Sequence, residues 1–285
     1  MSTPAVDLTR RTESPGPRFT PAEVEQFQRD GYVIVRALAD AELRNRMLEA
    51  TQDGLLKEVE PLEYEADMHY PGSPTSRESD GGRTIRRLKQ AHSRNFAFTD
   101  WVQRPELTGR LQQLLGTPII APLAHHNCIM TKQPDFSSDT GWHQDIRYWS
   151  YARPELVSVW TALTPERPEN GCLKLIPGSH TIVFDHTRLD EDLFLRSDVP
   201  ENQTLIDNAI TAELDPGDVL FFHCRTLHAA DRNRTDTTKF SVVFTFRPGD
   251  NPPTTGTRSA SLPELLIPAE SIEPTTISVE ENLQG

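Results

Sequence analysis

The chain has 285 residues, of which 36% are hydrophobic and 25% are charged, so it can bury the core of one large domain. Its formal net charge of −13 argues against a general nucleic-acid binder, because a phosphate backbone requires clustered Lys and Arg side chains. No stretch approaches the roughly 20 apolar residues of a membrane span, so we expect no membrane partner.

The three cysteines, Cys128, Cys172 and Cys224, lack the short paired spacing of a disulfide framework or a structural zinc site. The N-terminal segment is rich in Pro, Ser and Thr and has no apolar signal core. We therefore expect a cytoplasmic protein. Both a monomer and a homodimer are compatible with the sequence.

The composition predicts three parts. Residues 1–18 form a flexible arm, residues 19–250 form one folded domain, and residues 251–285 form a mostly irregular tail. Within that tail, four apolar residues could dock locally: Leu262, Leu265, Leu266 and Ile267.

The first third of the domain has mostly helical patterns. Thr20 can cap a helix that starts at Pro21, and Gly31 ends it. Residues 32–35 then predict a short strand, and a second helix begins after Asp40.

A third helix is predicted over residues 101–115, where leucines recur at helical spacing. The Pro/Gly/Ser-rich residues 70–82 lie between the second and third helices and predict a mobile loop. From residue 119 onward the pattern changes to short strands separated by turn signals. The clearest strands are residues 157–163, 172–176, 219–223 and 240–246. Many short strands with regular turns predict a sandwich or barrel, and the absence of βαβ alternation argues against a dinucleotide fold.

One short motif offers a metal site. In a strand, His143 and Asp145 share a face, so an imidazole and a carboxylate point to one centre. His228, which follows the strand at 219–223, is the best third ligand. Two imidazoles and one carboxylate on one side of an iron leave open positions for other ligands. His-x-Asp alone is weak, because with nine histidines and 42 acidic residues it arises by chance. The alternative is a surface histidine near a solvated aspartate.

Four blocks of the sequence, in the same order, resemble the phytanoyl-CoA dioxygenase family. They are FQRDGYVIV at 27–35, WHQDIRYW at 142–149, VWTAL at 159–163 with NGCLKLIPGSH at 170–180, and PGDVLFF at 216–222 with LH at 227–228 and NR at 233–234. The likeness extends over roughly residues 19–248.

This resemblance implies a mainly β fold with flanking helices, built on a double-stranded β-helix of the jelly-roll or cupin-like kind. It implies Fe(II) bound by His143, Asp145 and His228, with 2-oxoglutarate and O2 as cosubstrates. The expected activity is a dioxygenase that hydroxylates or otherwise oxidises an unactivated C–H bond of a small molecule and produces succinate and CO2. Related halogenases carry a small residue where this chain has Asp145, so the carboxylate favours hydroxylation. Desaturation and ring closure remain open.

The cosubstrate anchor departs from the family pattern. Family members use an arginine eleven residues after the distal histidine, and this position holds Lys239. A lysine can neutralise a carboxylate as a point charge, and Ser241 on the same strand face could help to hold it. Arg234 and Arg247 are the alternative anchors. The competing interpretation of Lys239 is a solvated lysine at the start of a strand.

Other residues are weaker candidates for the site. The resemblance places Trp160 beside the cosubstrate, although it could equally be a core aromatic. Lys132 is a further cosubstrate or substrate candidate, or else an exposed lysine. His180 is interpreted as a structural hydrogen-bonding residue of a turn. His125, His126 and His223 are interpreted as structural residues of strands.

The substrate candidates are two pairs of residues. Arg86 and Arg87 belong to the densest basic segment and could close as a lid over an anionic substrate, or form a solvated helix face. Tyr148 and Trp149 follow the metal motif and are expected to line the substrate pocket. Two other classes compete with an oxygenase: a catalytically silent β-helix protein that binds a metal or small acid as a sensor or scaffold, and a cupin-like zinc or manganese enzyme.

Overall fold

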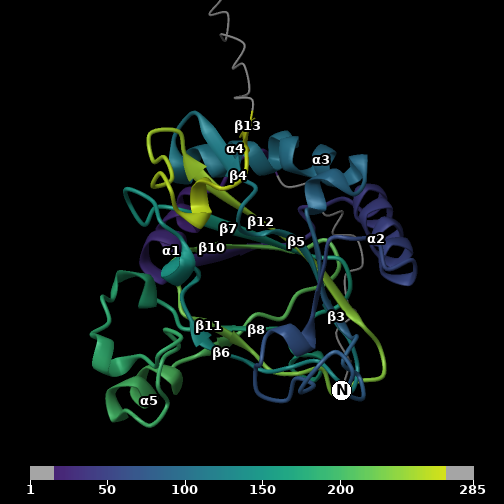
Figure 1. Ribbon diagram of the computed structural model, residues 1–285. Helices are drawn as coiled ribbons and strands as arrows, with labels where there is room; N and C mark the ends of the chain where they lie inside the picture. Colours follow the sequence, from purple (N-terminus) through teal and green to yellow (C-terminus); the bar gives the residue numbers. More distant parts are fainter. Residues whose placement is uncertain (1–15, 268–285) are drawn as a thin grey trace, which may run out of the picture.

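The computed structural model describes residues 16–267 and consists of two antiparallel sheets with helices on the outside (Figure 1). The larger sheet has nine strands. Its continuous order is β1 (Tyr32–Val35), β10 (Val219–His223), β7 (Val157–Ala162), β12 (Lys239–Pro248), β5 (Asn127–Lys132), β3 (Ile85–Lys89) and β2 (Leu62–Tyr64). In addition, β4 (Ile119–Pro122) pairs with β12 and with β13 (Glu264–Ile267).

The smaller sheet has four strands, in the order β6 (Thr140–His143), β11 (His228–Ala230), β8 (Leu173–Leu175) and β9 (Ile210–Thr211). Figure 1 shows the two sheets facing each other, with β7, β10 and β12 opposite β6, β8 and β11. The helices are α1 (Pro21–Asp30), α2 (Ala41–Leu56), α3 (Phe96–Gln103), α4 (Pro105–Leu115) and α5 (Pro200–Ile206). This architecture is the double-stranded β-helix with flanking helices that the sequence predicts.

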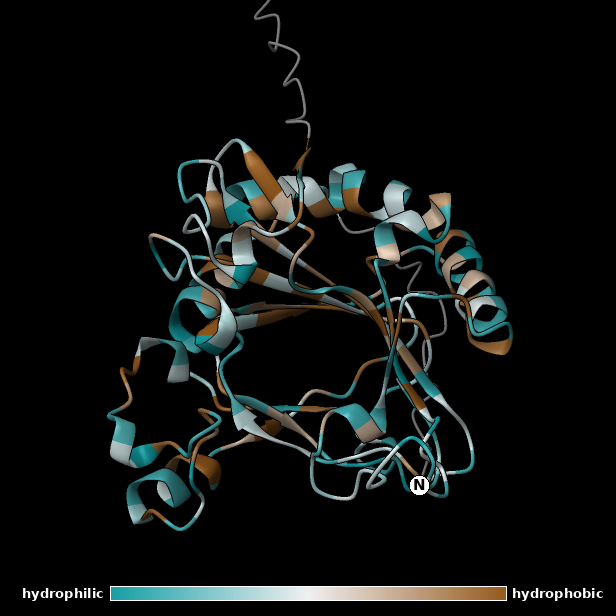
Figure 2. Cartoon of the chain, in the orientation of Figure 1, coloured by the Kyte–Doolittle hydropathy of each residue, from teal (hydrophilic) through white to brown (hydrophobic). Residues whose placement is uncertain are grey.

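Strand alternation separates two cores. Successive side chains of β12 point to opposite faces of the sheet, so Val242 and Phe244 face outward while Val243 faces the interior between the sheets. The outer core is completed by helix residues such as Met47 of α2 and Trp101 of α3. Helices α2, α3 and α4 lie along the outside of the larger sheet (Figure 1), and brown hydrophobic segments run along its strands in Figure 2. The helices therefore cover one face, and the other face remains for the interior of the barrel.

The expected elements at the N-terminus are confirmed. Thr20 and Glu23 form a complete capping box at the start of α1, and Asp40 caps α2. The single helix predicted over 101–115 is wrong at its start. The chain forms α3 and α4 instead, because Arg104 precedes Pro105 and adopts an extended conformation (φ −61°, ψ 133°) that breaks the helix.

The segment expected to be an irregular tail contains one strand. Residues 264–267 form β13 against β4, and Arg247 of β12 pairs with Glu264. Of the four apolar residues expected to dock here, Ile267 is buried and Leu265 packs against the outer core, both as part of this strand. The prediction is wrong for Leu266, which is 66% exposed, and for Leu262, which lies before the strand and is 41% exposed. Residues 1–15 and 268–285, which include most of the expected N-terminal arm, lie outside the described residues. Within residues 16–267, no helix is long and apolar enough to cross a membrane.

Gly31 joins the end of α1 to the loop before β11. Its φ of +78° ends the helix in the left-handed region, and its carbonyl accepts hydrogen bonds from the Thr226 hydroxyl and from the His223 backbone N–H, both at 2.8 Å. A Cβ atom at this position would lie 2.5 Å from Nδ1 of His180. Because Thr226 lies two residues before His228, this contact fixes the approach to β11.

Replacing Gly31 by alanine should lower the free energy of unfolding by about 2–5 kcal/mol, because a left-handed L-residue costs roughly 1–2 kcal/mol and overpacking adds roughly 1–3 kcal/mol. Urea unfolding followed by circular dichroism measures this loss. The matched control is Gly256→Ala, where φ is +79° but no heavy atom lies within 4 Å of the added Cβ. Equal losses in the two variants would show that the contacts around Gly31 carry no extra stability.

Candidate functional site

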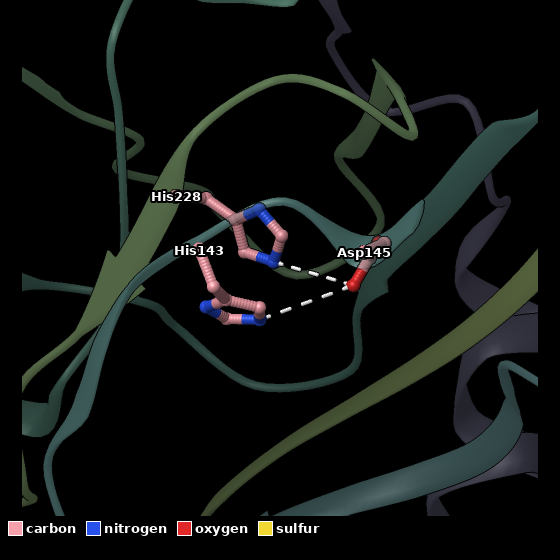
Figure 3. A group of neighbouring side chains, drawn as sticks. All are labelled: His143, Asp145 and His228. Carbon is pink, nitrogen blue, oxygen red and sulfur yellow. Dashed lines mark ion pairs between the residues drawn. The ribbon is translucent and has the colours of Figure 1, made fainter. Parts of the chain in front are cut away.

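The side chains of His143, Asp145 and His228 converge on one another (Figure 3). His143 is the last residue of β6 and pairs directly with His228, the first residue of β11. Nε2 of His228 lies 3.6 Å from Oδ1 of Asp145, and Nε2 of His143 lies 4.0 Å from the same oxygen. One ligand atom from each residue lies within 4.8 Å of the other two. The three side chains therefore surround a single point.

The reason for this convergence differs from the expected one. Strand β6 ends at His143, and Asp145 begins a 3₁₀ turn, so the two residues do not share a strand face. The cross-strand pair of histidines positions two of the ligands. The turn then brings the carboxylate of Asp145 to them.

The backbone sets the tautomer of both histidines. Nδ1 of His143 lies 2.8 Å from the carbonyl of Gly141, and Nδ1 of His228 lies 3.0 Å from the carbonyl of Thr226. Because a carbonyl only accepts, each Nδ1 carries the proton and each Nε2 presents a lone pair to the common point. Burial, with His228 beside it, also lowers the pKa of the His143 imidazole well below its usual value, which favours the neutral ligand form.

Asp145 is oriented by a second set of contacts that the sequence did not suggest. The Ser158 hydroxyl donates a hydrogen bond to Oδ2 at 3.0 Å, and Nδ1 of His126 lies 3.5 Å from the same oxygen. These contacts occupy Oδ2 and leave Oδ1 facing the histidines.

His126 lies in the turn before β5, so its assignment to a strand was wrong. Burial lowers the pKa of His126 to about 4, so it contacts Asp145 as a neutral ring.

An inner chamber adjoins the three ligands and has a volume of about 60 Å³. Its walls include Lys132, Trp160 and Lys239 in addition to the ligands. Lys132 of β5 and Lys239 of β12 are direct cross-strand neighbours, so both side chains project from the same face of the larger sheet. The expected cosubstrate residues thus lie together on this wall.

The carboxylate of Glu166 already pairs with Lys239, the residue expected to anchor the cosubstrate. Lys239 Nζ lies 2.8 Å from Oε2 of Glu166, while the Ser241 hydroxyl and the Trp160 indole N–H donate to Oε1 at 2.6 and 2.7 Å. Lys239 is 3% exposed and is therefore no solvated lysine. Glu166 was not among the site residues predicted from the sequence. It follows β7 and is 73 residues from Lys239 in the chain, so no local pattern links the two residues.

Lys132 differs from its neighbour. Its Nζ lies 3.5 Å from the carbonyl of Ala230, at the limit of a hydrogen bond, and it forms no salt bridge within residues 16–267. The alternative anchors lie elsewhere. Arg247 pairs with Glu264, and neither Arg247 nor Arg234 is among the residues that line the chamber.

The basic segment is a strand, which corrects both expectations for it. Arg86 and Arg87 lie on β3 within the barrel wall, neither on a helix face nor on a lid. Arg86 is 4% exposed and binds Glu65 at 3.0 Å, and Arg87 binds Glu63 at 3.0 Å. Because β3 pairs with β5, both arginines lie in the wall of the chamber and not on a movable lid.

A second, larger cavity of about 540 Å³ adjoins the inner chamber. Its lining includes Tyr148 and Trp149, and it shares His143 and Asp145 with the inner chamber. Trp149 stacks on His125 with ring centroids 4.9 Å apart. Two of the three ligands therefore line both a small chamber and a cavity large enough for a ligand of drug size.

Comparisons with known proteins agree with this architecture. A family model described as Phytanoyl-CoA dioxygenase (PhyH) matches residues 27–241. The "Probable phytanoyl-CoA dioxygenase" of Caenorhabditis elegans is 24% identical over 238 residues, covering 81% of this chain and 75% of that protein.

Solved structures show the same fold at low identity. EctD from S. alaskensis with bound Fe aligns with a TM-score of 0.68 at 19% identity, covering 90% of each chain. The epimerase SnoN, solved in complex with Fe3+, alpha ketoglutarate and nogalamycin RO, aligns with a TM-score of 0.66 at 21% identity. That alignment covers 85% of this chain and 89% of SnoN.

His143→Ala should weaken Fe(II) binding by more than about 100-fold, because losing a ligand exceeds the roughly 10–100-fold effect of losing an outer contact. Ser158→Ala should fall within that smaller range, since it frees Oδ2 of Asp145 but leaves all three ligands. Anaerobic calorimetric titration with Fe(II) measures both. His186→Ala, which removes an exposed histidine, is the control and should bind as the unaltered protein does. Tight Fe(II) binding by His143→Ala would place the metal elsewhere.

Proposed function

The chain belongs to the phytanoyl-CoA dioxygenase family, and on this premise we propose that it is an Fe(II)- and 2-oxoglutarate-dependent dioxygenase. We propose that it hydroxylates an unactivated C–H bond of a small molecule and produces succinate and CO2. The observation that carries the proposal is the convergence of His143, Asp145 and His228, with both Nε2 lone pairs and one carboxylate oxygen directed at one point.

The residues present fit Fe(II). Two neutral imidazoles and a carboxylate on one side of the ion are the ligand set of non-haem iron oxygenases, and they leave open positions for a 2-oxo acid and O2. When bound, the iron and its cosubstrates supply the oxidising chemistry. The chain's own part is to hold the ligands through Gly141, Thr226 and Ser158 and to place the substrate next to them.

Hydroxylation is the outcome that Asp145 favours. Its carboxylate occupies the position that a halide would need, so halogenation is disfavoured. The fold does not select among the remaining oxidations, because SnoN, which is described as an epimerase, shares it. The intact triad and its ordered outer contacts favour an enzyme over a catalytically silent sensor or scaffold, because binding alone does not require open iron positions.

We propose that the substrate is anionic and enters through the larger cavity. The cations Arg87, Lys89, Arg147 and Arg258 line this cavity, whereas its acidic residues are Glu63, which pairs with Arg87, and the ligand Asp145. This is a local excess of positive charge in a chain of net charge −13. Arg147 also lies over the rings of Tyr148 and Phe194, so a planar or apolar group fits beside the charge.

We propose a cytoplasmic location on the basis of the thiols. Cys128, Cys172 and Cys224 are buried and unpaired. Disulfides are common in proteins of oxidising compartments and rare in the cytosol, so three free thiols fit a reducing compartment.

Substrate-dependent succinate formation is the direct test of the activity. The protein with Fe(II), 2-oxoglutarate and O2 is incubated with a metabolite library, and succinate is measured by mass spectrometry. We expect the compounds that stimulate succinate release to carry a carboxylate, phosphate or sulfate group and to gain one oxygen atom. His143→Ala should release no succinate. Stimulation only by neutral or cationic compounds would contradict the proposed substrate class.

Arg258→Gln should raise the KM of an anionic substrate found in that screen by about 10-fold or more and leave kcat nearly unchanged, because it removes a charge-assisted contact distant from the reacting carbon. Steady-state kinetics separates the two constants. Arg29→Gln is the matched control, because Arg29 is exposed on α1 and does not line the cavity. A KM that stays the same in both variants would remove Arg258 from substrate binding.

A further inference from the structure

The positive charge of Lys239 is already neutralised by the carboxylate of Glu166. Its ammonium and the Glu166 carboxylate form a buried pair in which the two side chains are 2% and 0% exposed. Both carboxylate oxygens of Glu166 are satisfied, one by Lys239 and the other by Ser241 and Trp160. A buried carboxylate with this set of donors is a stable arrangement, because removing any one partner leaves a desolvated charge or an unpaired donor.

A ligand carboxylate cannot join this cluster without displacing Glu166. The backbone of Glu166 is held by two hydrogen bonds with Leu214, at 2.9 and 3.2 Å, so its carboxylate can leave the cluster only by rotation of the side chain. Displacement would bury an uncompensated carboxylate, which is strongly unfavourable. The anchoring charge for a dicarboxylic 2-oxo acid must therefore come from another residue of the chamber.

Lys132 is that residue by position and by charge. It lines the same chamber as the three ligands and projects from the same sheet face as Lys239. Among residues 16–267, no carboxylate forms a salt bridge with it, and its ammonium donates a hydrogen bond to the Ala230 carbonyl at 3.5 Å. Its aliphatic stem is fixed beside Gly171, where an added Cβ would lie 3.0 Å from Cδ and Cε of Lys132.

The electrostatics of Lys132 also favour an anionic ligand. Burial, followed by the positive charges of Lys239 and Arg86, lowers the pKa of Lys132 to about 7. A carboxylate beside the amine would favour its protonated form and would supply the partner that the chain itself does not.

From this arrangement we infer that Lys132, and not Lys239, binds the distal carboxylate of the 2-oxo acid, while Glu166 keeps Lys239 as a neutralised positioning pair. The inference rests on the proposed function, since it assigns a residue to the cosubstrate of that reaction. It makes Lys132 a specificity-determining residue for dicarboxylic over monocarboxylic 2-oxo acids. It also gives Lys239, at the family's arginine position, a structural role in the chamber wall in place of cosubstrate binding.

Two variants of opposite expectation test the inference. Lys132→Met nearly keeps the length of the side chain and removes its charge. The double variant Glu166→Gln/Lys239→Met removes both charges of the buried pair, so that neither is left without its partner. Each is titrated anaerobically with 2-oxoglutarate in the presence of Fe(II), and the visible charge-transfer band gives Kd without turnover. We expect Kd to rise by at least about 30-fold in Lys132→Met, since a charge-assisted contact is lost, and by less than about 3-fold in the double variant.

Lys174→Met is the matched control. Lys174 lies on β8 and pairs with Asp231 at 2.8 Å, so this variant removes the same charge from the same barrel but outside the chamber. Thermal unfolding of all variants checks that they fold. A second titration with pyruvate, which lacks the distal carboxylate, should give the same Kd for Lys132→Met as for the unaltered protein.

The outcomes separate the inference from the proposed function. An unchanged Kd in Lys132→Met with a large rise in the double variant would overturn the inference and return the anchor to Lys239. Absence of any 2-oxoglutarate-dependent band in the unaltered protein, with no succinate formed, would overturn the proposed function and the inference together. A large rise confined to Lys132→Met and to 2-oxoglutarate supports both.

Discussion

The antiparallel pairing of β6 with β11 is the contact on which the site depends. It places His143 directly opposite His228, so the strand pairing alone brings the two imidazoles together. Neighbouring backbone groups support this pairing. The carbonyls of Gly141 and Thr226 orient the two imidazole rings, and the carbonyl of Gly31 accepts a hydrogen bond from the Thr226 hydroxyl. The third ligand comes from the turn that ends β6. A small sheet of four short strands thereby fixes a metal centre.

Charge burial is the second constraint. The interior wall of the larger sheet carries two adjacent lysines, which would repel each other in a low-dielectric chamber if both were unpaired. Glu166 neutralises one of them, and the other is left facing the chamber. Arg86 and Arg87 follow the same rule, since each pairs with a glutamate of the neighbouring segment. A fixed set of buried pairs thus determines which charge remains for a ligand.

The two cavities divide the tasks of the proposed enzyme. The inner chamber of about 60 Å³ is suited to a small acid, and the outer cavity of about 540 Å³ is suited to a larger substrate with aromatic and cationic contacts. The two cavities share His143 and Asp145, so a small acid in one and a substrate in the other would both lie beside the metal ligands.

The sequence by itself determined the β-helix class, the capped helices α1 and α2, and the three residues of the metal site, because capping, alternation and motif order are local or ordered signals. Only the tertiary structure decided that Arg86 and Arg87 lie on a strand, that Ser158 and His126 orient Asp145, and that Glu166 occupies the anchor. The physical reason is that these partners are distant in the chain and meet through strand register. Periodicity within one segment shows which face a side chain takes, but it does not show which residue of another strand lies opposite.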